Sequence, residues 1–155
     1  MPSLSLPPDV RSPAEIRTAR RLARGVCRLF EDMGHAALTE FTLANGRRVD
    51  VIALDGRGVV SIAEIKSSVA DFRADLKWEA YLEFCDRFYF AVAADFPREL
   101  LPEEVGLIVA DDWSGSVVRD APALAMNGSR RRAQTLRLAL TAAQRLRRFT
   151  DPRLD

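Results

Sequence analysis

The sequence predicts an α/β fold in which helices flank a mixed β-sheet. A capped amphipathic helix opens the chain, three strand-like segments joined by short turns follow it, and a further strand comes only after a second helical segment. Short turns join antiparallel strands, whereas a strand reached through a helix can pair in parallel. The 155 residues fit one domain, which we expect over residues 12–150, between a loose lead-in at 1–11 and a tail at 151–155.

The first helix is predicted over residues 12–34. Ser12 suits the N-cap, Pro13 the first helical position, Glu15 the capping box and Gly34 the stop. An apolar stripe recurs at intervals of three and four residues, formed by Ile16, Ala19, Ala23, Val26, Cys27 and Phe30. The remaining face is cationic because it carries Arg17, Arg20, Arg21, Arg24 and Arg28.

The strands are predicted from composition and turn signals. Residues 35–43, 47–55 and 58–66 are separated by "ANG" and "DGRG", which predicts a three-stranded antiparallel meander. One helix is expected over 69–85, strands over 86–94 and 105–111, and a further strand or hairpin partner over 115–121. A terminal helix over 130–149 would bury Leu136, Leu140, Ala143 and Leu146. The predicted order is α-β-β-β-α-β-β-(β)-α.

Composition excludes several classes of protein. Apolar residues make up 48% and charged residues 29%, as in ordinary folded proteins, and no apolar run approaches the ~18–20 residues of a membrane span. The opening residues do not resemble a signal peptide, so we expect a cytoplasmic protein with no membrane partner. Cys27 and Cys85 lack a CxxC pattern and are expected to be reduced thiols, and His35 is the sole histidine, which argues against a zinc site or a Ser/His/Asp triad.

The net charge of +1 conceals an uneven distribution. Residues 1–48 carry 8 basic against 5 acidic residues, residues 49–128 carry 7 against 15, and residues 129–155 carry 8 against 2. The basic ends could supply a phosphate-binding surface, although a solvated helix face is the usual explanation for such runs.

A carboxylate and lysine constellation lies in the meander. Glu64 and Lys66 alternate with Ile65 and therefore point to one face of their strand, and the "DGRG" turn can bring Asp50 of the preceding strand near Glu64. Two adjacent carboxylates suit a hard cation, Mg²⁺ or Mn²⁺, and a lysine beside them could orient the attacking water or stabilise negative charge. The pattern favours metal-assisted phosphodiester hydrolysis. The alternative is a solvated, charged sheet face.

Asp50 with "EIK" resembles the motif of the PD-(D/E)xK nuclease superfamily, with Val49 in place of the proline. The longer signature "EIKSS..DF..D.KW..Y...CDRFYFAV" is similar to the MmcB-like family of bacterial DNA repair endonucleases, over about residues 12–126. The resemblance implies a three-layer α/β/α restriction-endonuclease-like core and metal-dependent DNA cleavage in repair. It also implies that Asp50 and Glu64 are metal ligands and that Lys66 is the catalytic lysine.

A further acidic ligand is implied by many members of that superfamily. Glu15 and Glu31 lie in the first helix, but Glu15 also fits the capping box, and we favour Glu40 on the strand beside Asp50. The alternative for Glu40 is a surface strand residue with no part in the site. For substrate binding we expect Arg48, Lys77, Tyr81 and Trp78 to contribute, with Lys77 and Tyr81 one helical turn apart. Core packing is the competing interpretation for the two aromatic residues. Asp71 and Asp75 lie one turn apart on the same helix, and for them we favour a solvated acidic face over a second metal site.

The expected function is a Mg²⁺- or Mn²⁺-dependent DNA endonuclease that acts on damaged or branched DNA. The alternatives are a Holliday-junction-type resolvase and a non-cleaving module that binds DNA or repair partners. Expected partners are DNA, a second copy of the chain in a homodimer, and DNA repair proteins.

Overall fold

The computed structural model describes residues 11–75 and 77–153. A six-stranded sheet, in the order β1-β2-β3-β4-β5-β6, forms the middle layer. The strands are β1 (Ala36–Thr42), β2 (Arg48–Leu54), β3 (Val60–Ile65), β4 (Arg87–Val92), β5 (Gly106–Ala110) and β6 (Gly115–Arg119). The predicted lead-in lies outside the described residues except for Arg11, as do the last two residues of the predicted tail.

The sheet is mixed, as the order of elements predicted. β1, β2 and β3 form the expected antiparallel meander, β3, β4 and β5 are parallel, and β6 returns antiparallel to β5. The segment whose assignment was open, 115–121, is therefore the hairpin partner of β5. Positive φ angles at Gly46 and Gly58 fit the two turns of the meander.

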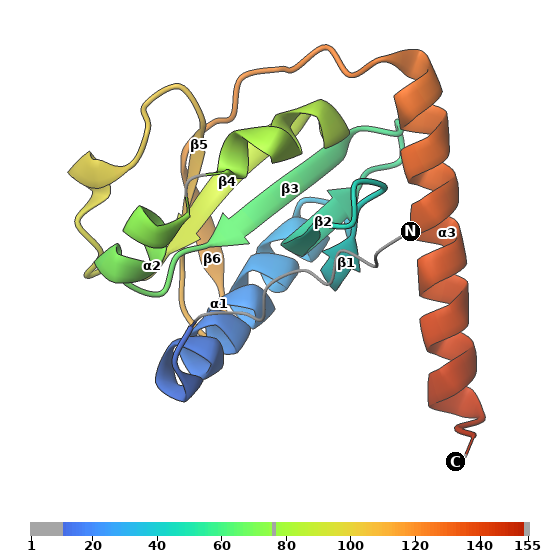
Figure 1. The fold of residues 1–155 in the computed structure, drawn as a ribbon, viewed down its shortest axis with the longest axis horizontal. Helices are drawn as coiled ribbons and strands as arrows, with labels where there is room; N and C mark the ends of the chain where they lie inside the picture. Colours follow the sequence, from blue (N-terminus) through green and yellow to red (C-terminus); the bar gives the residue numbers. More distant parts are fainter. Residues whose placement is uncertain (1–10, 76, 154–155) are drawn as a thin grey trace, which may run out of the picture.

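Helices cover both faces of the sheet and complete three layers (Figure 1). Helix α1 (Pro13–Asp32) begins with the predicted capping box between Ser12 and Glu15 and buries Ala19, Leu22, Val26 and Phe30 against one face. The opposite face is covered by α2 (Val69–Ala74), the 3₁₀ segment η1 (Trp78–Phe84) and part of α3 (Gly128–Thr150), and a second short 3₁₀ segment, η2 (Arg98–Leu100), precedes β5. The α/β/α arrangement is confirmed. In the described residues no helix is long and apolar enough to cross a membrane.

The prediction of one continuous helix over 69–85 was wrong. Helix α2 ends at Ala74, Asp75 adopts extended angles (φ −88°, ψ 95°), and the chain resumes as η1. The Asp75 carboxylate accepts a hydrogen bond from Lys66 Nζ at 2.6 Å and one from the Lys77 backbone N–H at 3.1 Å. A tertiary contact thus outweighs local helix periodicity, and Lys77 and Tyr81 are not one α-helical turn apart.

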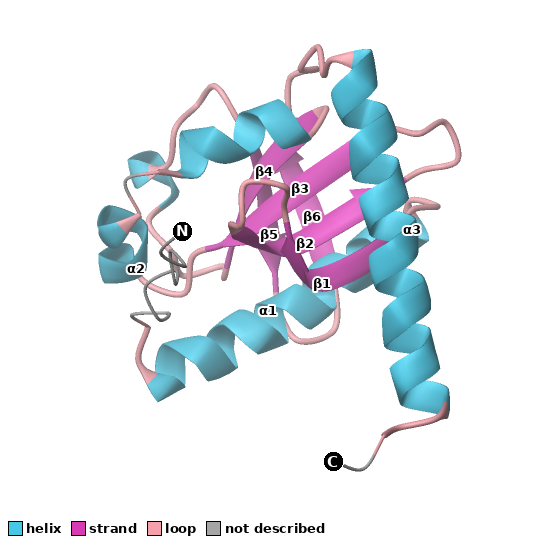
Figure 2. Cartoon of the chain, turned by 45° about the vertical axis from the view of Figure 1, so that its right-hand side comes forward, coloured by secondary structure: helices cyan, strands magenta, loops and turns pink. Residues whose placement is uncertain are grey.

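The predicted buried stripe of the terminal helix was also wrong. Leu136, Leu140 and Leu146 are 60%, 53% and 64% exposed, and Ala143 is exposed as well. The face that docks carries Arg131, Gln134, Leu138 and Arg145. Gln134 donates to the Phe84 carbonyl, and Arg145 donates to the Thr39 and Glu40 carbonyls, so polar contacts set the rotation of α3. Figure 2 shows α3 crossing the β1 edge of the sheet and continuing beyond it.

Both cysteines are thiols in the structure, as expected. Cys27 is half-buried on α1 and Cys85 is buried after η1. Burial raises the pKa of both thiols, to about 11 for Cys27, which keeps them protonated near neutral pH.

Candidate metal and phosphodiester site

The candidate site lies where β2 and β3 separate. Their ladder ends at the pair Val51–Ala63, and Asp50 and Glu64 would form the next pair. Their side chains take over the backbone bonding: the Asp50 N–H donates to Glu64 Oε1 at 2.9 Å, and the Ile65 N–H donates to Asp50 Oδ2 at 2.8 Å. On its other side β3 stays paired with β4 through Ile65–Ala91, and the Lys66 N–H donates to the Ala91 carbonyl. The two carboxylates therefore bridge a local opening in an otherwise continuous sheet.

The predicted convergence of Asp50 and Glu64 occurs; Glu64 is buried and Asp50 is partly buried. Glu64 is 6% exposed, and the Asp50 side chain is 17% exposed. Burial, followed by the neighbouring Asp50 charge, raises the pKa of Glu64 well above its ordinary value. Burial also raises the pKa of Asp50, although Arg11 and the Ile65 N–H oppose the change. Both shifts mean that the ionised pair is costly until a cation approaches it.

Lys66 lies in the same cluster and is bound to Asp75, so the prediction of a solvated acidic face was wrong for Asp75. The Lys66 side chain is 5% exposed, and Nζ donates to Asp75 Oδ2 at 2.6 Å. The Lys66 charge also acts to lower the pKa of both Asp50 and Glu64. An ammonium has three N–H donors, so the bond to Asp75 leaves two for other acceptors. Asp75 orients Lys66 at the end of β3.

Arg11 was also missed by the sequence analysis. Its guanidinium nitrogen lies 3.8 Å from Asp50 Oδ1, on the segment that leads into α1. The start of α1 is tied to the site by a second contact, because the Ser68 hydroxyl donates to Glu15 Oε1 at 2.7 Å. Glu15 is thus engaged by Ser12 and Ser68, and these hydrogen bonds lower its pKa. Asp75 is part of the signature "EIKSS..DF..D.KW", which gave it no role at the site, and no sequence pattern links Arg11 to the strand motif.

Glu40 faces Asp50 across β1 and β2, between the pairs Thr39–Val51 and Phe41–Val49. Its backbone has a positive φ of 50°, which is uncommon outside glycine, and its carbonyl accepts a hydrogen bond from Arg145. Glu40 is exposed and lines the same groove as Asp50. Within residues 11–75 and 77–153, however, no three carboxylate, imidazole or thiol groups gather as a metal site.

The donor set suits a cation held by two carboxylates. Asp50 and Glu64 each give one oxygen to a backbone N–H, and a hard cation would use Glu64 Oε2 and Asp50 Oδ1, the latter in place of its contact with Arg11. Mg²⁺ keeps several water ligands and is commonly bound by one or two carboxylates together with substrate phosphate oxygens. The pair therefore fits Mg²⁺ or Mn²⁺ without a third carboxylate.

A groove of about 540 Å³ runs beside Asp50 between α1 and the first two strands. Arg48, predicted to bind substrate, lines it together with Asp50 and Glu40. The groove is also lined by Arg11, Arg20, Arg24 and Ile65. Four guanidinium groups around one of the two carboxylates make a suitable surface for a phosphodiester chain.

The other predicted substrate-binding residues separate into two environments. Lys77 is exposed just before η1, and its carbonyl accepts a hydrogen bond from Arg47. Tyr81 stacks on Phe88, and its pKa is raised by burial and then by the Glu64, Asp75 and Asp50 charges, so its hydroxyl lies within electrostatic range of the carboxylate cluster. Tyr81 remains beside the site.

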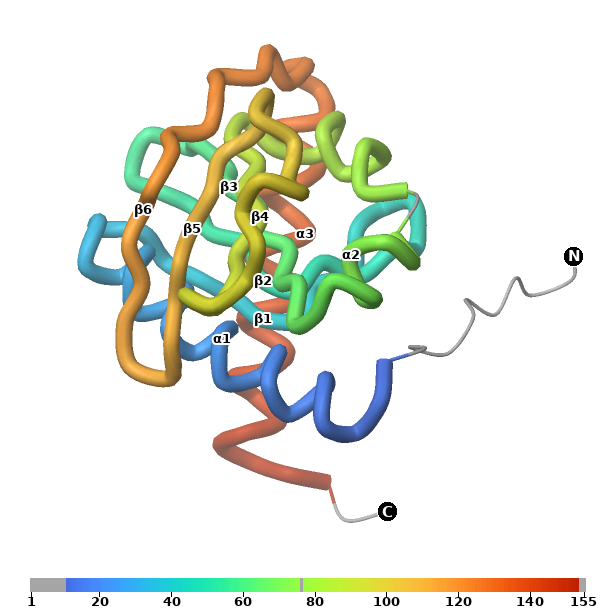
Figure 3. Tube along the Cα trace, turned by 90° about the vertical axis from the view of Figure 1, so that its left-hand side faces the viewer, coloured from blue at the N-terminus to red at the C-terminus, as the bar shows by residue number. Residues whose placement is uncertain are grey.

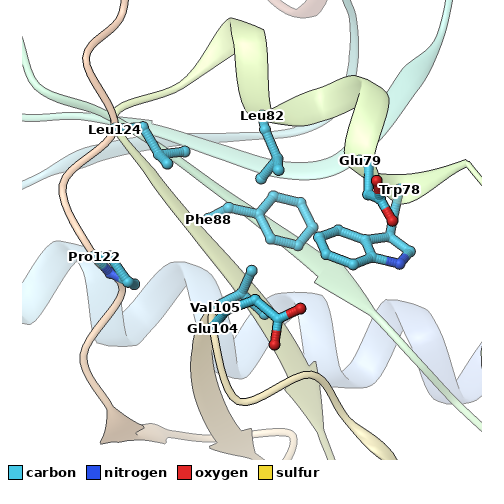
Figure 4. Close-up of a pocket in the computed structure, with 8 residues that line it drawn as sticks. All are labelled: Trp78, Glu79, Leu82, Phe88, Glu104, Val105, Pro122 and Leu124. Carbon is cyan, nitrogen blue, oxygen red and sulfur yellow. The ribbon is translucent and has the colours of Figure 1, made fainter.

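Trp78 belongs to the core side of η1. Its ring stacks on Phe88 and meets Phe90 edge to face, with centroid distances of 5.6 and 5.3 Å. It also lines a second pocket of about 310 Å³ with Phe88, Glu79 and Glu104 (Figure 4). That pocket shares no lining residue with the Asp50 groove. The packing interpretation of Trp78 therefore describes its position better than a place at the site.

The comparisons with known proteins give a family and one related fold. No curated protein matches the chain. One solved structure that matches is the SPO1766 protein of unknown function from Silicibacter pomeroyi, which is 45% identical in sequence. The alignment covers 87% of this chain and 92% of the SPO1766 chain, with a TM-score of 0.85. Residues 8–153 match the family described as DNA repair protein MmcB-like. That match spans nearly the whole chain, and the protein therefore belongs to the MmcB-like family of DNA repair proteins.

Proposed function

We propose that this protein is a divalent-metal-dependent deoxyribonuclease that hydrolyses phosphodiester bonds of damaged or branched DNA during repair. The observation that carries the proposal is the Asp50–Glu64 pair, whose pKa values are both raised, with Lys66 at the same strand end. Two neighbouring carboxylates removed from water are costly to keep ionised without a cation between them. Membership in a DNA repair family supports DNA as the substrate.

Each residue has a distinct part in the proposed reaction. The outward oxygens of Asp50 and Glu64 would hold Mg²⁺ or Mn²⁺, which when bound polarises the phosphodiester and lowers the pKa of a coordinated water. Lys66 Nζ, oriented by Asp75, would donate to the phosphate oxygens as negative charge develops on them. Arg48 and Arg11 in the adjacent groove would bind flanking phosphates. Glu40, in the same groove, is a candidate to bind the cation through water.

A non-cleaving DNA-binding module is the second candidate, and one observation favours it. Asp50 and Glu64 already accept backbone hydrogen bonds that close the opening between β2 and β3, and Lys66 is paired with Asp75. The cluster thus has a structural task that could retain these residues without catalysis.

Cleavage assays separate the two candidates. Purified protein is incubated with supercoiled plasmid and with labelled duplex, flap, four-way junction and single-stranded DNA, in Mg²⁺, Mn²⁺ or EDTA. The proposal predicts nicking or cutting that needs metal and is lost in Asp50→Asn and Lys66→Ala, while Glu103→Gln, an exposed acidic control, retains it. Preference for the junction would indicate a resolvase. Unchanged activity in both site variants, or DNA binding without any cleavage on every substrate, would overturn the proposal.

A further inference from the structure

An exposed aromatic ring lies on the arginine-rich side of α1. Trp113, in the turn between β5 and β6, is 63% exposed. The guanidinium carbons of Arg24 and Arg28 lie 4.7 and 5.2 Å from its ring centroid, and Arg28 also donates to the Trp113 carbonyl at 3.4 Å. A large exposed tryptophan held by two arginines is an uncommon surface feature.

The turn that carries Trp113 is fixed to α1. The Asp111 carboxylate accepts hydrogen bonds from the Trp113 and Ser114 backbone N–H groups, each at 2.8 Å. Gly25 lets the turn approach the helix closely, since an added Cβ there would lie 2.0 Å from the Asp111 carbonyl oxygen. Figure 3 shows the turn between β5 and β6 reaching α1. The ring is therefore presented by a rigid turn.

Arg24 connects Trp113 to the groove of the candidate site. It lines the groove that contains Asp50 and Arg48, and it also lies over the Trp113 ring. The arginines of α1 on this path, from Arg20 to Arg28, cover about 12 Å along the helix axis. A cationic path thus leads from the carboxylates across α1 to an exposed aromatic ring.

We propose that this path, named here the α1 track and formed by Arg11, Arg20, Arg24, Arg28, Arg48 and Trp113, binds a single-stranded segment of nucleic acid, with an unpaired base stacked on Trp113. The arginines hold the phosphodiester backbone, and the ring offers a surface to a base whatever its identity. Bases within a duplex are already stacked on one another, so an exposed ring favours an unpaired strand. The inference rests on the proposed function in one respect only, namely that the bound strand continues toward a catalytic site at Asp50.

Binding measured without metal tests the α1 track independently of cleavage. The fluorescence anisotropy of a labelled 12-nucleotide oligothymidylate is followed in EDTA with the full-length protein. We expect Trp113→Ala to weaken binding about 5- to 100-fold, Trp113→Phe to restore most of it, and a blunt duplex to be affected far less. Arg24→Gln should weaken binding and reduce its dependence on salt.

The matched control is the pair Arg147→Gln and Arg148→Gln at the exposed end of α3. Equal losses in this control and in Arg24→Gln, or unchanged binding in Trp113→Ala with an unchanged melting temperature, would overturn the inference. Equal competition by polyglutamate and by unlabelled oligothymidylate would also overturn it, since any polyanion would then suffice. If Asp50→Asn loses cleavage but binds the oligonucleotide normally, both the proposed function and the α1 track are supported. If the wild type binds through the α1 track but does not cleave, only the proposed function is contradicted.

Discussion

A carboxylate lies beside each end of β3, and the two have opposite pKa shifts: Asp86, just before β4, contacts the start of β3, and Glu64 lies near its end. At its start, Asp86 accepts a hydrogen bond from the Val60 N–H at 2.9 Å and two from the Arg131 guanidinium, at 2.6 and 2.5 Å. Burial acts to raise the pKa of Asp86, but these partners outweigh it and the pKa is lowered. At the other end, Glu64 accepts one backbone hydrogen bond, lies beside Asp50, and has a raised pKa.

This difference is what we expect if the Asp86 charge is structural and the Asp50–Glu64 pair binds a cation, as proposed above. The Asp86 cluster joins β3, β4 and α3, because Arg131 also donates to the Gly58 carbonyl and the Asp86 carbonyl accepts from Leu124. Its donors match its acceptors, so it stabilises the fold as it stands. The Asp50–Glu64 pair has more negative charge than its partners offset, which lowers the stability of the metal-free protein. We expect substitutions at the two ends to act on different properties.

The largest effect on stability is expected from Asp86→Ala. Removing the carboxylate leaves the Val60 N–H and the Arg131 guanidinium without their acceptor, at a cost of about 2–3 kcal/mol after allowance for the exposure of Arg131. For a chain of this size the melting temperature should fall by about 4–12 °C. Thermal unfolding followed by circular dichroism checks this, with the exposed Asp95→Ala as control. An unchanged melting temperature in Asp86→Ala would contradict the structural role of the cluster.

Glu64→Gln should have the reverse effect in EDTA. The amide keeps an oxygen for the Asp50 N–H but removes the charge that burial and Asp50 disfavour. We expect the melting temperature at pH 7 to stay constant or rise by a few degrees, while cleavage falls by at least about 10²-fold. A clear drop in stability together with retained cleavage would mean that Glu64 is a structural residue.

The pH dependence of stability should also differ between the two ends. Because the pKa of Glu64 is raised in the folded state, the folded protein binds more protons above the ordinary carboxyl value of about 4.3, and its stability falls as pH rises through that window. In EDTA at pH 7, the wild type should therefore have a lower free energy of unfolding than Glu64→Gln. This difference should shrink as the pH is lowered from 7 toward 5. Urea unfolding at several pH values measures this, and a difference that grows on acidification would contradict the raised pKa.

The contribution of Asp86 to the free energy of unfolding should change with pH in the opposite direction. Its pKa is lowered in the folded state, so its contribution is present above about pH 4 and is lost as pH falls through the folded value. The difference in unfolding free energy between the wild type and Asp86→Asn should narrow below that pH. A difference that stays constant down to pH 3 would show that the Arg131 pair does not depend on ionised Asp86.

The grouping of charged side chains near the end of β3 was predictable from the sequence because it depends on local geometry. Strand alternation and the short turn between β2 and β3 were enough to place Asp50, Glu64 and Lys66 together, because both constraints act within about fifteen residues. Asp75 and Arg11 were not predictable, since each depends on where a loop returns. The 69–85 segment has helical periodicity, but the bond between Asp75 and Lys66 interrupts it, and no propensity scale includes such a bond.

Helix α3 shows a second limit of sequence patterns. Its leucines mark an apolar stripe at helical spacing, yet the docked face contains Gln134 at 3% exposure and two arginines with backbone or carboxylate partners. A hydrophobic pattern assigns the buried face by apolar residues alone and cannot foresee a face held by hydrogen bonds.

The smallest effect is therefore expected on the exposed stripe of α3. Leu140→Gln should change the unfolding free energy by no more than about 0.5 kcal/mol, because Leu140 is 53% exposed. Leu138→Ala, two residues earlier on the docked face, should cost about 2 kcal/mol. Chemical denaturation of both variants compares the two faces. Equal losses would mean that the Leu140 face is buried in solution, as in the expected homodimer.

The most direct test of the account is the thermal shift caused by Mn²⁺ in the absence of DNA. A cation bound between Asp50 and Glu64 stabilises the folded state by mass action, so the wild type at about 100 times the dissociation constant should melt about 5–10 °C higher than in EDTA. Asp86→Asn should melt lower but show the same rise, whereas Glu64→Gln should show almost none. An equal rise in the wild type and in Glu64→Gln would contradict the assignment of the carboxylate pair as the metal site.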